Sequence, residues 1–377
     1  MSHIIAVHLL NDRSGSPLVL RNALDALHHA GHRLDLLTAT PGPAGHLSHL
    51  PGARTHALPY RWSPSAWRTL LRFAWVQVVV FWKVLRLAHP QATVYVNSLL
   101  PFGAALAGRC RGARVVYHLH EVSIRPASLR RLLCAVVNRT AHQAVFVSEY
   151  VRRELGLTVA RQEVVYNALS PAFVEQAAAA PPAPDTPFTV LMACSLKDYK
   201  GVLELFALAA ALPDLRFELV LNAADEQVQA YRRAHPAPPN LQLFSTAPDM
   251  HPFYQRAAVV LNLSRPDEWV ETFGMTVLEA LQYGRPVVVP PVGGVAEVNV
   301  VGQTGFAIDG RDLPRLTQAL QLLRRHPATY ARMALACRHR AAAFAPDEFA
   351  RHIRRCFLTP ALQPAPDRAA YAEPLPA

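Results

Sequence analysis

The sequence predicts two α/β domains, each built on a parallel sheet with helices on both faces. Continuous apolar runs of strand length alternate with segments of helical periodicity, which is typical of doubly wound parallel sheets. The alternation stops at an alanine- and proline-rich run near the middle of the chain and then resumes. Because 51% of the 377 residues are hydrophobic, the chain can form two substantial cores.

The first domain is predicted over residues 1–172. An apolar run covers 4–10, turn residues follow at 11–17, and apolar residues have helical spacing over 18–29. Further strands are expected at 33–38, 93–97, 114–120 and 144–148. A basic segment, a longer apolar stretch and a small-residue cleavage site do not follow the first strand, so we expect no signal peptide.

A stiff spacer is predicted between the domains at 173–187, where alanine and proline dominate. The second domain is predicted over 188–342, with strands at 188–194, 216–222, 241–244, 258–263 and 286–290. Its helices are expected at 201–212, 273–283, 315–325 and 329–344. A last helix is expected over 343–358, with its return to the first domain left open, followed by a disordered tail over 359–377.

The net charge, the motifs and the cysteine count limit which binding partners and which cellular compartment fit the sequence. The formal net charge of +11 suits nucleic acid, an anionic membrane surface or phosphorylated substrates, and equally an ordinary arginine-rich surface. Zinc-finger, aromatic RNP and basic-region motifs are absent from the sequence, so nucleic acid is the least favoured partner. The five cysteines are odd in number and form no CxxC pair, so we expect reduced thiols in a cytoplasmic protein.

The segment 67–88 combines an apolar stretch with flanking cations. Its uncharged part, residues 73–82, is ten residues long and lies between Arg72 and Lys83. A bilayer-spanning helix needs roughly 20 such residues. We therefore predict a helix that covers the first sheet, and its tryptophans and cations leave open peripheral contact with the inner membrane surface.

Two glutamates eight residues apart, Glu271 and Glu279, flank a glycine and the start of a predicted helix. The N-terminus of a helix offers backbone N–H groups and a positive dipole end, which suits a phosphate. Eight residues span about 12 Å along a helix axis, so the two carboxylates could hold hydroxyl groups at opposite ends of a sugar nucleotide. Spacing alone favours an ordinary amphipathic helix with two solvated acids. The choice between such a helix and a sugar-nucleotide site therefore depends on the neighbouring sequence.

The stretch from Glu271 to Glu279 resembles the E-x7-E motif of the family 4 glycosyltransferases. The apolar strand at 259–263, Gly-Arg-Pro-Val-Val at 284–288 and Gly-Gly-Val-Ala-Glu at 293–297 are also similar to that family. The resemblance reaches to about residue 358. It implies the GT-B architecture, with two Rossmann-like doubly wound domains facing a central cleft, and a retaining, metal-independent transferase.

The resemblance also implies roles for the motif residues. Glu271 would lie near the reacting donor sugar, and Glu279 would accept hydrogen bonds from the ribose hydroxyls. A carboxylate suits vicinal hydroxyls because it has two acceptor oxygens. The backbone of four residues would contact sugar hydroxyls and phosphates: Phe273, Gly274, Met275 and Thr276. Glu268 lies outside the spacing and is interpreted as a loop residue.

The segment 195–201, Ser-Leu-Lys-Asp-Tyr-Lys-Gly, lies between a predicted strand and a predicted helix. It resembles the family segment in which an arginine and, five residues later, a lysine hold the donor diphosphate. Lys200 matches the lysine, whereas Ser195 stands where the family has arginine. Lys197 or Arg265 could supply the missing charge, and the sequence does not decide between them.

Ser-Gly-Ser at 14–16 follows the first predicted strand. Small residues at a helix N-terminus permit the close approach of a phosphate or a sugar, although tight turns use the same residues. The loop resembles the glycine-containing first loop of the family, which faces the donor. Gly15 is therefore expected to contact the donor, and Arg13 and Ser14 the donor or the acceptor.

The strand predicted at 114–120 ends in His120 and Glu121. Open α/β sheets bind ligands at the carboxyl ends of their strands. Many family members have His-Asp or His-Glu here, with the histidine near the reacting sugar, so His120 is predicted to be catalytic. His118, two residues away on the same side of the strand, and Glu121 are secondary candidates.

The chain resembles family members of the bacterial polysaccharide and lipopolysaccharide type. This resemblance implies transfer of a hexose-type sugar from a nucleotide-sugar donor, such as a UDP- or GDP-sugar, to a glycan or lipid-linked acceptor in cell-envelope polysaccharide or lipopolysaccharide synthesis. No cofactor or metal is expected, in agreement with the absence of a DxD motif beside a strand end. A non-catalytic protein that binds a sugar nucleotide or a glycan remains open because of Ser195, and so does a sugar-nucleotide epimerase. A two-domain dehydrogenase is disfavoured because the first loop lacks GxGxxG.

Overall fold

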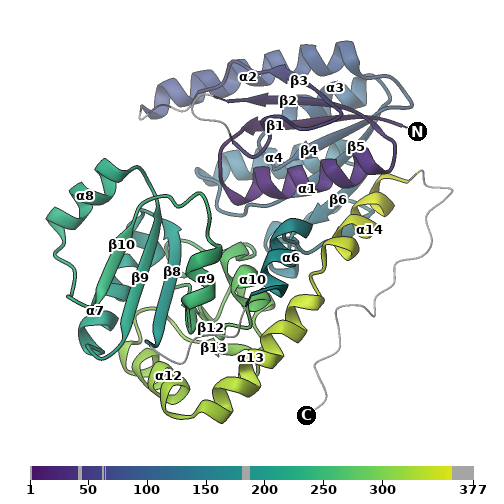
Figure 1. Cartoon of the computed structure of the whole chain (residues 1–377). Helices are drawn as coiled ribbons and strands as arrows, with labels where there is room; N and C mark the ends of the chain where they lie inside the picture. The colour runs from purple at the N-terminus through teal and green to yellow at the C-terminus, as the bar shows by residue number, and fades with distance from the viewer. Residues whose placement is uncertain (1, 41–44, 62, 64, 181–186, 359–377) are drawn as a thin grey trace. The chain divides into compact units, whose positions relative to one another are not determined.

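The computed structural model describes residues 2–40, 45–61, 63, 65–180 and 187–358. They form two compact α/β units (Figure 1). One unit comprises Met1–Ala168 together with Pro346–Ala377, and the other comprises Leu169–Ala345. The predicted disordered tail and residues 181–186 of the predicted spacer lie outside the described residues.

A seven-stranded parallel sheet forms the centre of the first unit, in the order β3-β2-β1-β4-β5-β6-β7. Chain order reverses between β1 and β4, and ligands of open α/β sheets bind at the carboxyl edge beside such a reversal. The strands are β1 (His3–Leu10), β2 (Arg33–Ala39), β3 (Ala53–Ala57), β4 (Thr93–Asn97), β5 (Arg114–Leu119), β6 (Gln143–Phe146) and β7 (Gln162–Val164).

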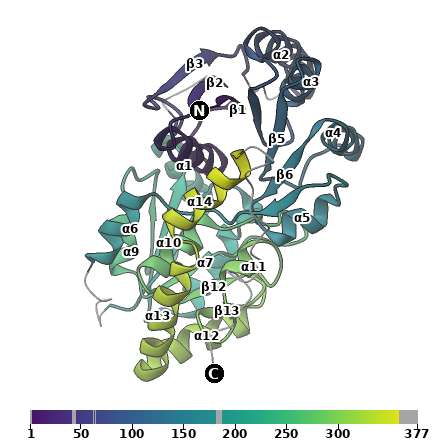
Figure 2. The same cartoon turned by 90° about the vertical axis from the view of Figure 1, so that its right-hand side faces the viewer.

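Helices cover both faces of this sheet, as the alternating sequence pattern predicts. Figure 2 shows α1 and α14 on one face and α2, α3 and α4 on the other. The helices are α1 (Gly15–His29), α2 (Ala66–Leu87), α3 (Phe102–Cys110), α4 (Ala127–Thr140), α5 (Glu149–Leu155) and α14 (Pro346–Phe357). Among the described residues, no helix is both long enough and apolar enough to cross a membrane.

The last helix, α14, belongs to the first unit. The Arg114 guanidinium of β5 donates hydrogen bonds to the carbonyls of Cys356 and Leu358 at 2.8 and 2.9 Å. The Phe357 ring packs edge-on against Tyr95 of β4 at 4.9 Å between centroids. Helix α14 therefore completes the layer beside α1.

The second unit contains a six-stranded parallel sheet in the order β10-β9-β8-β11-β12-β13. Its core includes aliphatic residues of α7 and α12, which pack together over the central strands. The strands are β8 (Thr189–Ser195), β9 (Arg216–Asn222), β10 (Leu241–Phe244), β11 (Val259–Leu261), β12 (Val287–Val289) and β13 (Gly305–Ala307). The helices are α6 (Pro171–Ala178), α7 (Val202–Ala211), α8 (Asp225–Ala234), α9 (His251–Arg256), α10 (Met275–Gln282), α11 (Val295–Val298), α12 (Leu313–Arg325) and α13 (Pro327–Ala342).

The boundary region differs from the predicted spacer. The units divide between Ala168 and Leu169, and the first part of the predicted spacer lies in α6. The Ser170 hydroxyl caps α6 by accepting from the Phe173 N–H at 3.2 Å, and a proline follows at the first helical position. The Phe173 ring then packs on His251 at 4.3 Å. Alanines that look like a spacer in the sequence therefore join a capped helix of the second unit.

Candidate functional site

Lys200 and Glu271 meet beyond the carboxyl ends of β8 and β11. Lys200 ends the short helical turn after β8, and Glu271 lies in the loop before α10. The ammonium group and the carboxylate form an ion pair, and the Ser264 hydroxyl donates to the same carboxylate oxygen at 2.9 Å. The two charged side chains are only 13% and 19% exposed, so their attraction is screened less than that of a surface pair.

Two aromatic rings lie beside the Lys200 ammonium group. Tyr199 and Trp269 stack at 5.3 Å between centroids with an interplanar angle of 21°. The Lys200 nitrogen lies 5.2 Å from the Trp269 ring and 5.7 Å from the Tyr199 ring, which is within cation–π range. Ser264, Tyr199 and Trp269 were not predicted from the sequence, because no spacing rule connects them to a lysine.

Arg265, one candidate for the missing diphosphate cation, is paired with two carboxylates. Its Nε lies 2.6 Å from Glu204 and its terminal nitrogen 3.0 Å from Glu268. The hydrogen bonds to Glu204 and Glu268 raise the pKa of Arg265 above its usual value. Lys197, the other candidate, is exposed, and its backbone N–H bonds to the Ser195 carbonyl at 2.8 Å. Because Arg265 is already paired with two carboxylates, Lys197 is the cation of the two that is more accessible to a phosphate.

Close backbone packing fixes the loop that carries Glu271. The Glu271 carbonyl accepts from the Gly294 N–H at 2.8 Å, and a Cβ on Gly293 would lie 2.5 Å from that carbonyl oxygen. Gly293 and Gly274 have φ values of +95° and +104°, which favour glycine. A Cβ on Gly274 would also lie 2.6 Å from Val295. The glycines therefore hold two loops together at the start of α10.

Helix α10 begins at Met275, two residues later than predicted. Its N-cap, Gly274, has no side chain to bond the first N–H groups, and the first turn contains no acidic residue. The N–H groups at this end, including those of Met275 and Thr276, thus suit an anion. Phe273 precedes the helix as a buried anchor, with its ring edge-on to Phe344 at 5.8 Å.

Glu279 has a different setting from Glu271. One of its carboxylate oxygens accepts a hydrogen bond from the Tyr254 hydroxyl of α9. Burial raises the pKa of Glu279 to about 7, and the Tyr254 hydrogen bond opposes that rise. The side chain therefore changes its charge close to neutral pH.

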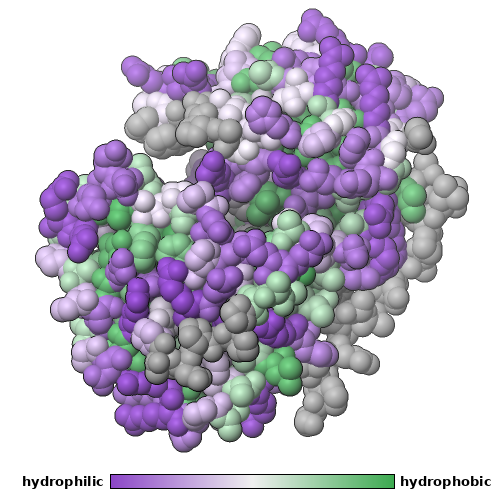
Figure 3. Space-filling view, viewed as in Figure 1, coloured by the Kyte–Doolittle hydropathy of each residue, from purple (hydrophilic) through white to green (hydrophobic). Residues whose placement is uncertain are grey.

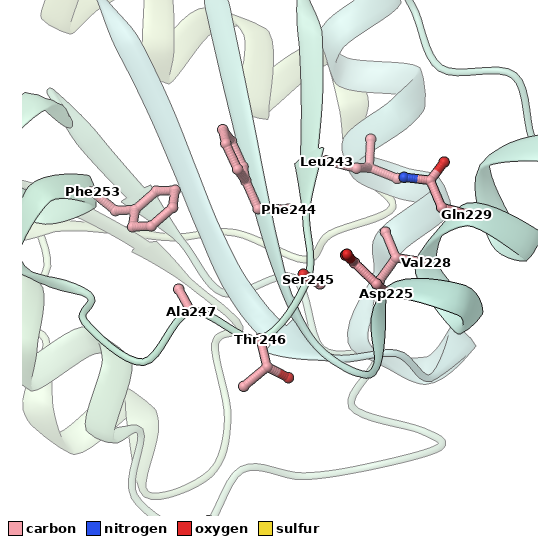
Figure 4. Close-up of a pocket in the computed structure, with 9 residues that line it drawn as sticks. All are labelled: Asp225, Val228, Gln229, Leu243, Phe244, Ser245, Thr246, Ala247 and Phe253. Atoms are coloured by element: carbon pink, nitrogen blue, oxygen red, sulfur yellow. The ribbon is translucent and has the colours of Figure 1, made fainter.

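A hollow of about 300 Å³ lies beside α9, between the end of β10 and α8 (Figure 4). Figure 3 shows hydrophobic surface gathered beside α8 in this region. In Figure 4, the Phe244 and Phe253 rings lie on one side of the hollow and residues of α8 on the other. Polar lining groups come from Asp225, Gln229, Ser245 and Thr246. This hollow was not predicted from the sequence, although residues directly after a predicted parallel strand were the available signal.

In the first unit, His120 directly follows β5 and is buried. Its Nε2 lies 2.9 Å from the Asn97 Oδ1, and the Asn97 Nδ2 lies 3.0 Å from the His8 Nδ1. An amide oxygen only accepts and an amide nitrogen only donates. The network therefore places the His120 proton on Nε2 and leaves Nδ1 as an acceptor. Burial, with smaller effects from His118 and His8, holds the pKa of His120 well below 6.5.

His118 has a more enclosed position than His120. Their rings lie 4.4 Å apart, which fits the predicted placement on one side of the strand. The His118 Nδ1 lies 2.7 Å from the Tyr95 hydroxyl, and burial lowers the pKa of His118 to about 3. Because His118 is 0% exposed, the geometry gives it a packing role under His120.

Glu121 stabilises the loop after β4. Its carboxylate accepts from the Leu99 N–H at 3.0 Å, next to Ser98, a non-glycine residue with a φ of +83°. Burial raises the pKa of Glu121, and hydrogen bonds from Leu99 and Ser98 oppose the rise. These contacts give Glu121 a structural role in shaping the carboxyl edge of the first sheet.

The first loop of the chain is exposed at the N-terminus of α1. Ser14 is the N-cap, and Gly15 begins the helix. The backbone and hydroxyl of Ser14 both donate to the Asp12 carboxylate, at 2.8 and 2.5 Å. Arg13 is exposed between them. The loop thus presents a helix N-terminus with one cation beside it and no acidic residue in the first turn.

Within each unit, the structure brings the predicted residues to the carboxyl edge of the sheet. The charged set lies in the second unit, and the histidines and the small-residue loop lie in the first. In the part of the chain that the structure describes, no three His, Cys, Asp or Glu side chains are arranged to hold a metal ion. The roles of these residues in donor binding and catalysis stay predictions.

Two family models together match most of the chain. The model described as glycosyl transferases group 1 matches residues 174–340, and the model described as glycosyltransferase family 4 matches residues 13–173. The chain is also similar to the D-inositol 3-phosphate glycosyltransferase of Arthrobacter sp. (strain FB24), with 28% identity over 211 residues. That match covers 52% of this chain and 48% of the relative, so the chain spans about half the length of this curated relative.

Two solved structures have the same fold along nearly the whole chain. The Anabaena protein HepE, in complex with UDP and glucose, is 18% identical with a TM-score of 0.75, covering 94% of this chain and 99% of its own. Sucrose-phosphate synthase from Thermosynechococcus elongatus is 17% identical with a TM-score of 0.76, covering 95% and 98%. At these identities the likeness concerns the fold, which is the GT-B pair of Rossmann-like domains.

Proposed function

Because the chain belongs to the family 4 glycosyltransferases of the GT-B type, we propose that it transfers a hexose-type sugar from a nucleotide-sugar donor. The acceptor is a glycan or a lipid-linked sugar, and the configuration at the anomeric carbon is retained. One observation carries the proposal. Lys200, Ser264 and Glu271 form a hydrogen-bonded cluster beside the N-terminus of α10, at the carboxyl edge of a parallel sheet.

The donor diphosphate is assigned to Lys200 and the N-terminus of α10. Lys200 is mostly buried, and a cation in a site with little water interacts more strongly with a phosphate than an exposed one does. The uncapped N–H groups at 275 and 276 add hydrogen-bond donors from the backbone. Together they would compensate for Ser195 at the position where the family has arginine.

The nucleoside is assigned to Glu279 and the hollow beside α9. Phe253 lines the hollow, and its neighbour Tyr254 donates to Glu279. We assign the base to the hollow and the ribose to the Glu279 carboxylate. Solved structures of Anabaena HepE contain UDP or UDP-glucose, which makes UDP-sugars the first donors to test.

In a retaining transfer, the acceptor hydroxyl attacks the anomeric carbon from the face that the diphosphate leaves. The bond from that carbon to the diphosphate oxygen breaks, the bond to the acceptor oxygen forms, and the leaving phosphate takes the acceptor proton. Catalysis then depends on positioning and on stabilising the charge that develops on the diphosphate. Lys200 and α10 meet that charge, without a metal ion in our proposal, and Glu271 orients the donor sugar.

His120 is assigned to the sugar. Its neutral ring is fixed by Asn97 with the proton on Nε2, so its Nδ1 would accept a hydrogen bond from a sugar hydroxyl. The acceptor is assigned to the loop with Arg13 and Ser14 at the start of α1. The resemblance to bacterial envelope enzymes supports a role in cell-envelope polysaccharide or lipopolysaccharide synthesis, in the cytoplasm.

The test is a thermal-shift screen of UDP- and GDP-sugars against the purified chain, because a ligand that binds the folded state raises the apparent melting temperature. We expect a shift with at least one intact sugar nucleotide and a smaller shift with the sugar alone. Incubation of that donor with glycan and lipid-linked acceptors, followed by proton NMR, then reports turnover and the anomeric configuration. Binding without any donor turnover would favour a non-catalytic binding protein, and an inverted product would exclude the retaining mechanism.

A further inference from the structure

Helix α2 has an apolar face that the described residues leave uncovered. Six of the fourteen exposed large hydrophobic side chains in the described residues lie on this helix. At about 100° per residue, they fall within an arc of about 140° on one side. They are Trp67 (67% exposed), Leu70 (50%), Leu71 (52%), Trp75 (60%), Val78 (46%) and Trp82 (51%).

The opposite side of α2 is buried in the first unit. Val76, Val80 and Val84 are fully buried, and α2 packs beside α3 (Figures 1 and 2). The helix is therefore held by one apolar face while it exposes a second. A contiguous exposed apolar surface of this kind marks an interaction site on a soluble protein.

Cations line one edge of the exposed stripe. Arg68, Arg72, Lys83 and Arg86 follow the apolar arc directly on the helical wheel, and residues 66–87 contain no Asp or Glu. Arg72 and Lys83 donate to the backbone carbonyls of Arg61 and Ala57 at 3.3 and 2.9 Å. None of the four takes part in an ion pair within the described residues. The edge therefore keeps its positive charge.

We propose that this face of α2 binds the surface of an anionic lipid bilayer. The helix would lie in the plane of the interface, with Trp67, Trp75 and Trp82 at the level of the headgroups, where amphipathic aromatic rings are enriched. The cations beside them would meet anionic headgroups, each contributing to binding. A second copy of the chain is a poorer partner, because it presents the same cations and brings no acidic residue from α2.

Bilayer binding is independent of the proposed transferase activity, since it needs neither a donor nor turnover. The test is co-sedimentation of the purified full chain with vesicles of phosphatidylcholine alone or mixed with phosphatidylglycerol. We expect binding to the mixed vesicles, weakening as salt is added, together with a blue shift of tryptophan fluorescence. Binding to phosphatidylcholine alone should be at least tenfold weaker.

Paired variants separate the two parts of the face. Trp75→Ser with Trp82→Ser should weaken binding to mixed vesicles at least tenfold, because the variant lacks the apolar area that the two rings would bury in the bilayer. Arg68→Gln with Arg72→Gln should remove most of the preference for anionic lipid. Leu335→Ser on α13, where the side chain is 72% exposed, is the matched control and should bind as the parent chain does. Melting temperatures confirm that each variant is folded.

Three results would overturn the proposal. The first is no binding of the parent chain to anionic vesicles, and the second is equal binding by both paired variants. The third is a lipid-free dimer in analytical ultracentrifugation that the tryptophan variant converts to monomer, since α2 would then be an interface between two copies.

Discussion

Charge distinguishes the candidate site of the second unit from that of the first. In the second unit, Lys200 and Glu271 form an ion pair, two stacked aromatic rings lie beside Lys200, and Arg265 is held by two further carboxylates. In the first unit, His8, His118 and His120 are buried, and burial lowers the pKa of each. The second unit has paired charges beside the N-terminus of α10, whose N–H groups suit an anion. The histidines of the first unit offer neutral hydrogen-bonding groups with fixed orientation. Under the proposed function, the second unit supplies donor affinity and the first supplies an oriented hydrogen-bonding group for the sugar.

The largest expected effect is on turnover, from His120→Ala. A group that contacts the reacting sugar mainly in the transition state should affect kcat rather than donor affinity. We expect kcat to fall by about 10² to 10³, the scale of losing one oriented hydrogen-bonding group, with donor affinity nearly unchanged. Steady-state kinetics and donor titration measure the two quantities.

His118→Ala is the matched control for this prediction. His118 is completely buried. Its loss should therefore lower the melting temperature clearly and have only a small effect on the kcat of the folded variant. If a folded His120→Ala enzyme turned over at the parental rate, the catalytic assignment would be wrong. Circular dichroism identifies a variant that is merely unfolded.

The second largest effect is on donor affinity, from Lys200→Met. Hydrogen bonds to charged groups contribute about 1.5–3 kcal/mol, so we expect the donor dissociation constant to rise about 10- to 100-fold. The variant also leaves Glu271 without its cation. The double variant with Lys200→Met and Glu271→Gln lacks both charges. It should bind the donor as weakly as the single Lys200→Met variant does. Recovery of affinity in the double variant would show that Lys200 serves the loop rather than the diphosphate.

Lys197→Met tests how the chain manages without the family arginine. Lys197 is exposed and Arg265 is already paired. A loss of affinity at 197 comparable with that at 200 would identify Lys197 as the substitute cation. Unchanged affinity would leave the diphosphate to Lys200 and α10.

A smaller effect is expected from Glu279, and it should depend on pH. The pKa of Glu279 is raised to about 7 in the folded protein from 4.5. The folded state therefore holds more protons than the unfolded state between pH 4.5 and about 7, so the free energy of unfolding should fall as pH rises through that window. Donor affinity should rise over the same window, because the ionised carboxylate accepts hydrogen bonds from the ribose hydroxyls at both oxygens.

Glu279→Gln should remove both pH dependences, since glutamine does not ionise. Glu279→Ala should weaken donor binding about tenfold at pH 8, the loss expected for about one to two hydrogen bonds. Isothermal titration at several pH values and thermal melts give the two slopes. A folded Glu279→Ala variant with parental affinity would remove the ribose assignment.

Several strands and helices of both units are predicted well from the sequence, because the signals for them are local. Buried parallel strands such as β1 and β8 are continuous apolar runs, and a helix is predicted after Glu271, although its observed start at Met275 is two residues later than expected. The structure confirms these elements. The fixed spacing of Glu271 and Glu279 places them on either side of that helix start, although their different environments cannot be read from spacing.

Contacts between distant segments could not be predicted. Trp269 reaches Lys200 across 69 positions of chain, and Glu279 receives the Tyr254 hydroxyl from another helix. The return of α14 depends on Arg114, whose partners lie 242 and 244 residues away. The hollow beside α9 exists only because three separate segments meet there. Each of these features depends on tertiary packing rather than on local periodicity.

The smallest expected effect is that of removing divalent metal ions. If Lys200 and the N-terminus of α10 together neutralise the leaving diphosphate, its developing charge has partners from the chain itself. Activity with the best donor should then be the same after treatment with EDTA and dialysis as before. The chain lacks the family arginine at Ser195, and Arg265 is committed to Glu204 and Glu268, so this test is demanding. Loss of activity in EDTA that magnesium or manganese restores would show that the charge of the second unit is insufficient. Restoration of metal-independent turnover by Ser195→Arg would then identify the missing cation as the cause.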